Sequence, residues 1–172
     1  YGAFTGVRAP FAEVLDEAKR LIMADSLAAE LQGVTEALYR IAQADRGTAD
    51  FTRNRLRQAI ENITAAFPVY RTYLDEQPVR TEDRRVLAWA LATARQRATA
   101  ADQRAHAFVE QVLLSHDRSP AVRHFIGRFQ QFTAPVMAKS MEDTAFYRYH
   151  RLVSLNDVGG DPRRFGVSPP AF

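Results

Sequence analysis

The spacing of apolar residues along the chain predicts a protein built mostly of helices. In residues 11–22, apolar positions recur every three or four residues, and Lys19 is among the charged residues expected outside that face. A second helix is predicted over 27–41, where Leu, Val and Ile form a heptad-like seam. Asp25 and Ser26 precede it, and either side chain can cap a helix start.

A third predicted helix has a buried stripe from Leu56 to Phe67 and ends at Pro68. Thr48 and Asp50 are its candidate caps. The residues that follow, 67–78, combine aromatic and β-branched side chains with flanking prolines. This composition predicts an extended connection in place of another helix.

Three more helical patterns follow the connection. One starts at Thr81, one covers 105–113, and one opens at Ser119-Pro120, with Ser as cap and proline in the first turn, and runs through Phe129. The sequence therefore predicts an all-α fold, a bundle of about six helices over residues 1–132.

The pattern changes at residue 133, where we expect a domain boundary. The segment 133–172 is predicted to hold a short helix over 134–142. In 145–153, aromatics alternate with Arg and His, which fits a short strand or a helix. Turn residues and an aperiodic Pro-rich end follow, so this segment is expected to be mostly irregular. Because the chain begins without Met and stops within this stretch, we expect it to be a piece of a longer protein.

Composition narrows the class of protein. With 172 residues, 47% hydrophobic and 25% charged, the chain fits a globular domain with a real core. The absence of cysteine excludes a disulfide scaffold and a cysteine nucleophile. No apolar run approaches the roughly 20 residues that span a bilayer, and no signal-peptide plan is present. A cytoplasmic location without membrane contact is the resulting expectation.

Charge and motifs exclude further classes. The net charge is only +3, and although Arg53, Arg55 and Arg57 form a run, a spacing of two puts Arg55 on another helical face. A solvated surface is therefore favoured over nucleic-acid binding. The 4 histidines lack the spacing of a metal site, and no glycine-rich phosphate loop occurs. We expect neither a metal nor a cofactor.

The acidic pair Glu142-Asp143 is the strongest candidate for chemistry, because it lies beside Lys139, Tyr147 and Arg148. Aromatic faces and charged groups in one cluster are typical of a carbohydrate site, and Lys139 is one of few lysines in an arginine-rich chain. Adjacent helical residues point about 100° apart, so the pair alone is a poor nucleophile and acid couple. Helix capping with ion pairing and a role in binding both remain open.

Two motifs carry a family resemblance. Residues 135–166, PVMAKSMEDTAFYRYHRLVSLNDVGGDPRRFG, closely resemble maltooligosyltrehalose synthase, a family of the α-amylase superfamily, and residues 67–74, FPVYRTYL, resemble a second signature of it. Residues 1–132 otherwise resemble the family more loosely, in helical pattern and order. The sequence departs from the family at Ser140, where Gly is common, at His150, where Asn is common, and at Asp157, where Glu is common.

The resemblance implies an enzyme of trehalose biosynthesis that converts the reducing-end α-1,4 linkage of a maltooligosaccharide to α,α-1,1 by intramolecular transglycosylation. It implies that residues 1–132 are a helical domain inserted in a (β/α)8 barrel, and that 133–172 return to that barrel. The three catalytic carboxylates would lie outside this chain, so the chain alone is expected to be inactive. Lys139, Glu142, Asp143, Tyr147 and Arg148 are expected to bind substrate.

Two alternatives remain at this point. The chain could be a helical module that docks other proteins through its arginine-rich faces, or part of another transferase acting on α-glucans. Under the favoured interpretation its partners are the maltooligosaccharide substrate and the remainder of the barrel.

Overall fold

The regular secondary structure of the described residues is entirely helical. The structure is a computed structural model that describes residues 9–74, 78–96, 98–117 and 119–164, and these contain six long α-helices and no strand. The helices are α2 (Phe11–Ala24), α3 (Ala28–Gln43), α4 (Arg53–Ala66), α5 (Thr81–Arg95), α6 (Ala100–Leu114) and α7 (Pro120–Ser140). A π-helical turn η1 (Met141–Ala145), a short α8 (Phe146–Arg148) and a 3₁₀ turn η2 (Val153–Leu155) follow. The all-α prediction is confirmed.

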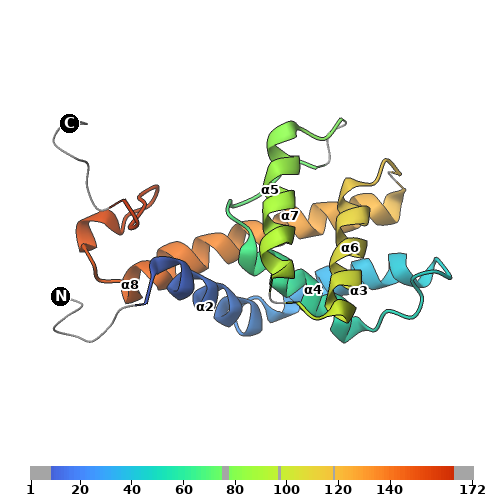
Figure 1. Ribbon diagram of the computed structural model, residues 1–172, viewed down its shortest axis with the longest axis horizontal. Coiled ribbons are helices and arrows are strands. Elements are labelled where there is room, and N and C mark those ends of the chain that lie inside the picture. The colour runs from blue at the N-terminus through green and yellow to red at the C-terminus, as the bar shows by residue number, and fades with distance from the viewer. Residues whose placement is uncertain (1–8, 75–77, 97, 118, 165–172) are drawn as a thin grey trace.

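Helix α7 organises the molecule. It runs lengthwise, with α3 packed along it, while α4 contacts α3, α5 and α6 (Figure 1). At the other end of α7, helix α2 packs against α7, α4 and η1. One helix therefore joins the main bundle to the segment that carries the predicted site.

The main core is apolar and rich in phenylalanine. Phe125 and Phe129 of α7 are fully buried, and Phe129 meets the ring of Phe67 edge-on at 5.7 Å between centroids. Phe51 stacks on Phe108 of α6 at 5.3 Å. Burying one such side chain contributes roughly 1.5–3 kcal/mol. The Phe67 contact also attaches the connection after α4 to α7.

A second, smaller cluster fixes the end of the molecule. Phe11, the first residue of α2, stacks on Phe146 at 6.0 Å and meets Tyr149 edge-on at 5.3 Å. The buried alanines Ala18 and Ala145 let the helices approach closely within the same cluster. Helix α2 thus holds α8 in place from outside the main core.

The predicted caps of α3 and α4 are wrong. The cap of α3 is Leu27, which is buried and makes no side-chain cap bond, so burial outweighs the capping preference of Asp25 or Ser26. The cap of α4 is Thr52, whose hydroxyl accepts from the Arg55 amide. Thr48 instead donates to the carbonyl of Ala42, at the end of α3. The predicted cap at Ser119 is confirmed.

The helix predicted to run through Phe129 and the short helix predicted over 134–142 are not separate, because α7 is continuous from Pro120 to Ser140 with Pro135 inside. Proline removes the bond to the carbonyl of Gln131, which lies on the exposed side of α7, while Val136 and Met137 continue the buried face. The predicted boundary between residues 132 and 133 falls inside this helix, and the division into two domains stays a prediction.

In the region where a strand or a helix was expected, the helical alternative is seen. Phe146–Arg148 is α8, and residues 149–164, all described, contain η2 and turns but no strand. Of the predicted irregular end, residues 165–172 lie outside the described residues. None of the described helices is long and apolar enough to cross a membrane.

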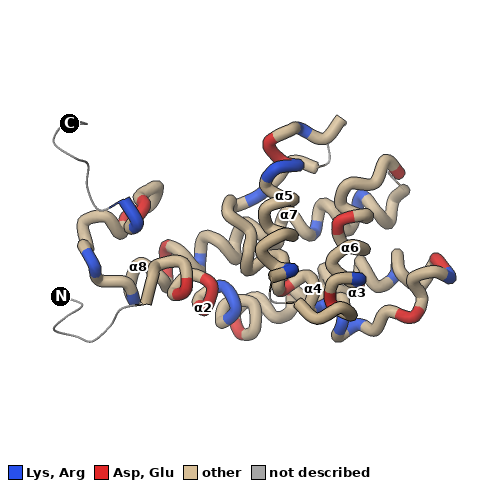
Figure 2. The backbone as a smooth tube through the Cα atoms, viewed as in Figure 1, with Lys and Arg blue, Asp and Glu red and all other residues tan. Residues whose placement is uncertain are grey.

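The arginine run 53–57 is divided between neighbours. Positive and negative residues are interleaved along the chain (Figure 2). Arg53 pairs with Glu36 of α3 at 2.9 Å, whereas Arg55 pairs with Asp102 of α6 at 2.6 Å. These partners confirm that Arg55 faces another direction from Arg53.

Candidate functional site

The predicted site residues lie on one continuous segment, α7–η1–α8, which contains a π-helical turn. In this turn the amide of Phe146 donates to the carbonyl of Met141, five residues earlier. The Thr144 hydroxyl donates to the carbonyl of Lys139 at 2.9 Å, again over five residues. A side-chain donor thus satisfies a carbonyl left by the wider turn. Such turns occur frequently at functional sites because they re-aim the side chains around them.

Three of the predicted residues form an exposed stripe, Lys139, Asp143 and Tyr147, at intervals of four residues. All three are at least partly exposed, and Tyr147 is 75% exposed, the most exposed large hydrophobic side chain among the described residues. Arg148, also exposed, follows directly. The stripe presents an ammonium, a carboxylate and an aromatic face to solvent. These groups can bind a neutral polyhydroxylated molecule by donating to it, accepting from it and stacking on it.

Glu142 lies to the side of the stripe and has a partner that the sequence did not indicate. Its Oε1 accepts a hydrogen bond from the hydroxyl of Tyr70, which belongs to the FPVYRTYL connection. Partial burial and this hydrogen bond to the carboxylate raise the pKa of Tyr70 to about 12. Among the described residues, neither Lys139 nor Arg148 forms an ion pair with Glu142 or Asp143. The structure therefore brings together the two motifs that carry the family resemblance.

The connection that carries Tyr70 is anchored on both sides. The Lys19 ammonium donates to the carbonyls of Phe67 at 2.6 Å and Ala65 at 3.2 Å. At the other end, the Leu74 amide donates to the buried Gln130 side chain at 2.6 Å. These bonds hold a non-helical segment against α2 and α7, so that Tyr70 is positioned over η1.

Lys19 was expected outside the apolar face of α2, and this prediction is wrong. The residue is only 3% exposed, because α2 packs against both α4 and α7 and therefore has two buried sides. Burial lowers the pKa of the Lys19 ammonium to about 8, and the nearby Asp16 carboxylate opposes this effect. Its hydrogen bonds satisfy carbonyls at the C-terminal end of α4, a position where positive charge is favoured.

The chain after α8 is folded back onto the site. Asn156 donates to the carbonyls of Phe146, at 2.8 Å, and Tyr149. It thereby takes the place of a helical continuation. The three positions that depart from the family pattern differ in burial, since Ser140 is buried whereas His150 and Asp157 are exposed.

The histidines do not form a metal site in the part of the chain that the structure describes, where no group of three or more His, Cys, Asp or Glu side chains could hold an ion. His106 of α6 is completely buried, and both of its ring nitrogens are without a hydrogen-bond partner. Burial lowers the pKa of His106, with Asp102 opposing and Arg95 assisting that shift.

Comparison with known proteins identifies sequences and a structure that this chain resembles. No protein-family profile matches the chain. A Mycobacterium tuberculosis protein, named provisionally as a maltooligosyl trehalose synthase, is 60% identical over 45 residues, 26% of this chain and 6% of that protein. The same match is found in a second strain of that species.

A solved structure extends the likeness over the whole chain. A point mutant of maltooligosyltrehalose synthase from Arthrobacter ramosus matches 99% of this chain with a TM-score of 0.74 and 32% identity. The matched region makes up 19% of that protein. By sequence and by fold, the chain is therefore related to the maltooligosyltrehalose synthases and corresponds to a segment of about one fifth of the Arthrobacter enzyme.

Proposed function

We propose that this chain forms the acceptor side of an active site that converts the reducing-end α-1,4 linkage of a maltooligosaccharide to α,α-1,1. The observation that carries the proposal is the meeting of the two resemblance motifs, where Tyr70 contacts Glu142 beside the exposed stripe. The relationship to the maltooligosyltrehalose synthases supplies the substrate class.

The proposed reaction needs two displacements at one anomeric carbon. A carboxylate outside this chain attacks the anomeric carbon of the penultimate glucose, the bond to O4 of the terminal glucose breaks, and a second carboxyl protonates that oxygen. The released glucose turns over, and its 1-hydroxyl attacks the same carbon while giving its proton back to the second group. The carboxylate then leaves, and no water is consumed.

The task of this chain is to hold the released glucose during the turn. Lys139 donates to sugar hydroxyls, Asp143 accepts from them, and Tyr147 offers its ring to the apolar face of the sugar. Glu142 is held by Tyr70 and presents its remaining lone pairs, while Arg148 supplies further donors. A glucose that escapes before the second displacement is replaced by water, and the result is hydrolysis.

Two substitutions in the complete enzyme containing this chain test the assignment. Lys139→Ala and Asp143→Ala are expected to raise the share of glucose, the hydrolysis product, relative to the trehalose-type product from maltopentaose. Arg123→Ala is the matched control, because Arg123 is an exposed cation in the first turn of the same helix. An unchanged product ratio in both site variants would remove these side chains from the acceptor site.

The same assay separates the alternative functions. Transfer of glucosyl units between chains, with no α,α-1,1 product, would favour another α-glucan transferase. The 172-residue chain alone is expected to give no product, because the displacements require carboxylates that it does not supply. Formation of a trehalose-type product by this chain alone would contradict that argument.

A further inference from the structure

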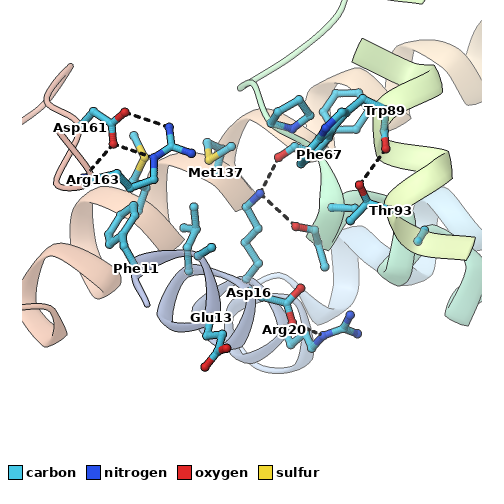
Figure 3. A pocket seen from close by; sticks show the side chains of 18 of the residues that line it. Phe11, Glu13, Asp16, Arg20, Phe67, Trp89, Thr93, Met137, Asp161 and Arg163 are labelled. Atoms are coloured by element: carbon cyan, nitrogen blue, oxygen red, sulfur yellow. Dashed lines mark hydrogen bonds and ion pairs between the residues drawn. The ribbon is translucent and has the colours of Figure 1, made fainter. Parts of the chain in front are cut away.

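A cavity of about 490 Å³ lies on another side of α7 from the exposed stripe. It is enclosed by α2, the end of α4, α5, the end of α7 and the turn at residues 160–163 (Figure 3). Lys139, Asp143 and Tyr147 are not among the described residues that line it. The cavity is thus separate from the proposed acceptor site, and nothing in the proposed reaction uses it.

One wall of the cavity offers an exposed aromatic face. Trp89 of α5 is the single tryptophan of the sequence. Its side chain is 54% exposed and lies at the end of the cavity near Phe67 and Thr93 (Figure 3). A large flat indole left half in solvent beside a cavity can cover an apolar face of a ligand. The CH groups on the faces of a pyranose ring are such a surface.

A second wall holds polar groups already fixed in place. Arg20 of α2 donates to Asp16 at 3.0 Å and to the side-chain oxygen of Asn62, on α4, at 3.2 Å. This network orients a carboxylate, a guanidinium and an amide on the cavity wall. Planar groups of these three kinds donate to and accept from neighbouring hydroxyls in pairs.

The charges on the lining residues select a neutral ligand. Three are acidic, Glu13, Asp16 and Asp161, and three are basic, Lys19, Arg20 and Arg163, so their formal charges cancel at neutral pH. Arg163 forms two hydrogen bonds with Asp161, at 2.8 and 2.9 Å, and Lys19 is occupied by carbonyls. The lining therefore carries no net formal charge that would attract a charged ligand, and a purely apolar ligand would leave the polar wall without water or partners.

We propose that this cavity is a second carbohydrate site, which binds a glucosyl unit of a maltooligosaccharide with Trp89 as its stacking face. Asn62, Asp16 and Arg20 are the partners of the sugar hydroxyls. The choice of an α-1,4-glucan rests on the proposed function, whereas binding of a neutral pyranose ring follows from the cavity itself. Such a site would hold a distant part of the chain whose reducing end is being rearranged.

The single tryptophan makes the proposal directly measurable. Titration of the 172-residue chain with maltotriose is expected to change Trp89 emission saturably, with half-saturation in the millimolar range, below about 50 mM. Cellotriose, with β-1,4 linkages, is expected to bind at least about tenfold more weakly. No saturable change with either sugar up to about 50 mM would overturn the proposal.

Variants that keep Trp89 locate the sugar. Asn62→Ala and Arg20→Ala are each expected to weaken maltotriose binding about tenfold, since each removes hydroxyl partners. Gln58→Ala, at an exposed residue one turn earlier on α4 that does not line the cavity, is the control and is expected to leave the titration unchanged. Circular dichroism checks that each variant is folded. Maltotriose affinity equal to that of the wild type in both cavity variants, or loss of binding in Gln58→Ala, would refute the site.

Calorimetry with Trp89→Ala and Trp89→Phe completes the test. The alanine variant is expected to lose the binding heat and the phenylalanine variant to retain part of it. Undiminished binding heat in Trp89→Ala would also overturn the proposal. Failure of the proposed function would appear elsewhere, in the products formed by the complete enzyme, and would leave the response of Trp89 to a pyranose sugar intact.

Discussion

Replacing Lys19 by Met should change how the stability of this protein depends on pH. Lys19 is buried, donates to the carbonyls of Phe67 and Ala65, and has a pKa lowered by burial from 10.5 to about 8. Between these two values the unfolded chain binds a proton at Lys19 that the folded chain does not. Stability therefore rises with pH across this window, and the charged form costs folding free energy below it.

The magnitude follows from the pKa difference. The full shift corresponds to about 3 kcal/mol, and most of it is recovered between pH 7 and pH 10. Lys19→Met has no ionisable group at this position and lacks the pH-dependent contribution. The unfolding free energy of the wild type should therefore rise relative to that of Lys19→Met by about the recovered amount between pH 7 and pH 10. The lost hydrogen bonds to two carbonyls add a constant penalty of roughly 1–3 kcal/mol.

Urea unfolding followed by circular dichroism at pH 7, 8, 9 and 10 measures both proteins under the same conditions. The chain provides a matched control in Lys139→Met, which removes an exposed lysine in place of a buried one. Profiles of the wild type and Lys19→Met that stay parallel from pH 7 to 10 would refute the reasoning from burial.

Three further predictions follow from other buried or paired groups. Because burial lowers the pKa of His106 in the folded protein, this histidine takes up a proton in the unfolded chain first as the pH falls, and the free energy of unfolding should decrease below about pH 6.5. In urea unfolding, His106→Leu should show a smaller decrease. Phe129→Ala should cost about 3–5 kcal/mol in the same assay, because it opens a cavity in a fully buried site against Phe67, and a loss below about 1 kcal/mol would contradict this. Glu142→Gln removes the carboxylate that Tyr70 contacts, so ultraviolet titration should show the tyrosine pKa of about 12 moving down toward its ordinary value; no movement would mean that burial alone raises it.

The helical fold could be predicted because each long helix repeats its apolar residues over several turns. The ends of the helices were harder to predict than their interiors. Thr48 and Asp50 are residue types that often cap helices, but in the folded protein they form other contacts. Thr48 donates to a carbonyl at the end of α3, and Asp50 pairs with Arg104 of α6. The continuity of α7 through Pro135 depends on which side of the helix meets the core, and the change of sequence pattern at residue 133 does not contain that information.

The candidate site, too, could be predicted only in part from the sequence. The stripe residues lie within one segment, so a local motif was enough to name them. Tyr70 reaches Glu142 across 72 positions, and Lys19 reaches Ala65 across 46, and such pairings are set by the packing of α2 and the connection against α7. The burial of Lys19 was missed because an amphipathic pattern assumes one packed face, whereas α2 has two neighbours.

The π-helical turn fixes the rotational setting of everything that follows it. Met141–Ala145 accommodates one residue more than an α-helical path would need for the same advance. If the same residues followed a regular α-helical path, the extra residue would rotate α8 by about 100° relative to the bundle. Phe146 would then leave Phe11. The orientation of the segment after α7 therefore depends on the wider winding of this turn as much as on the side chains that it carries.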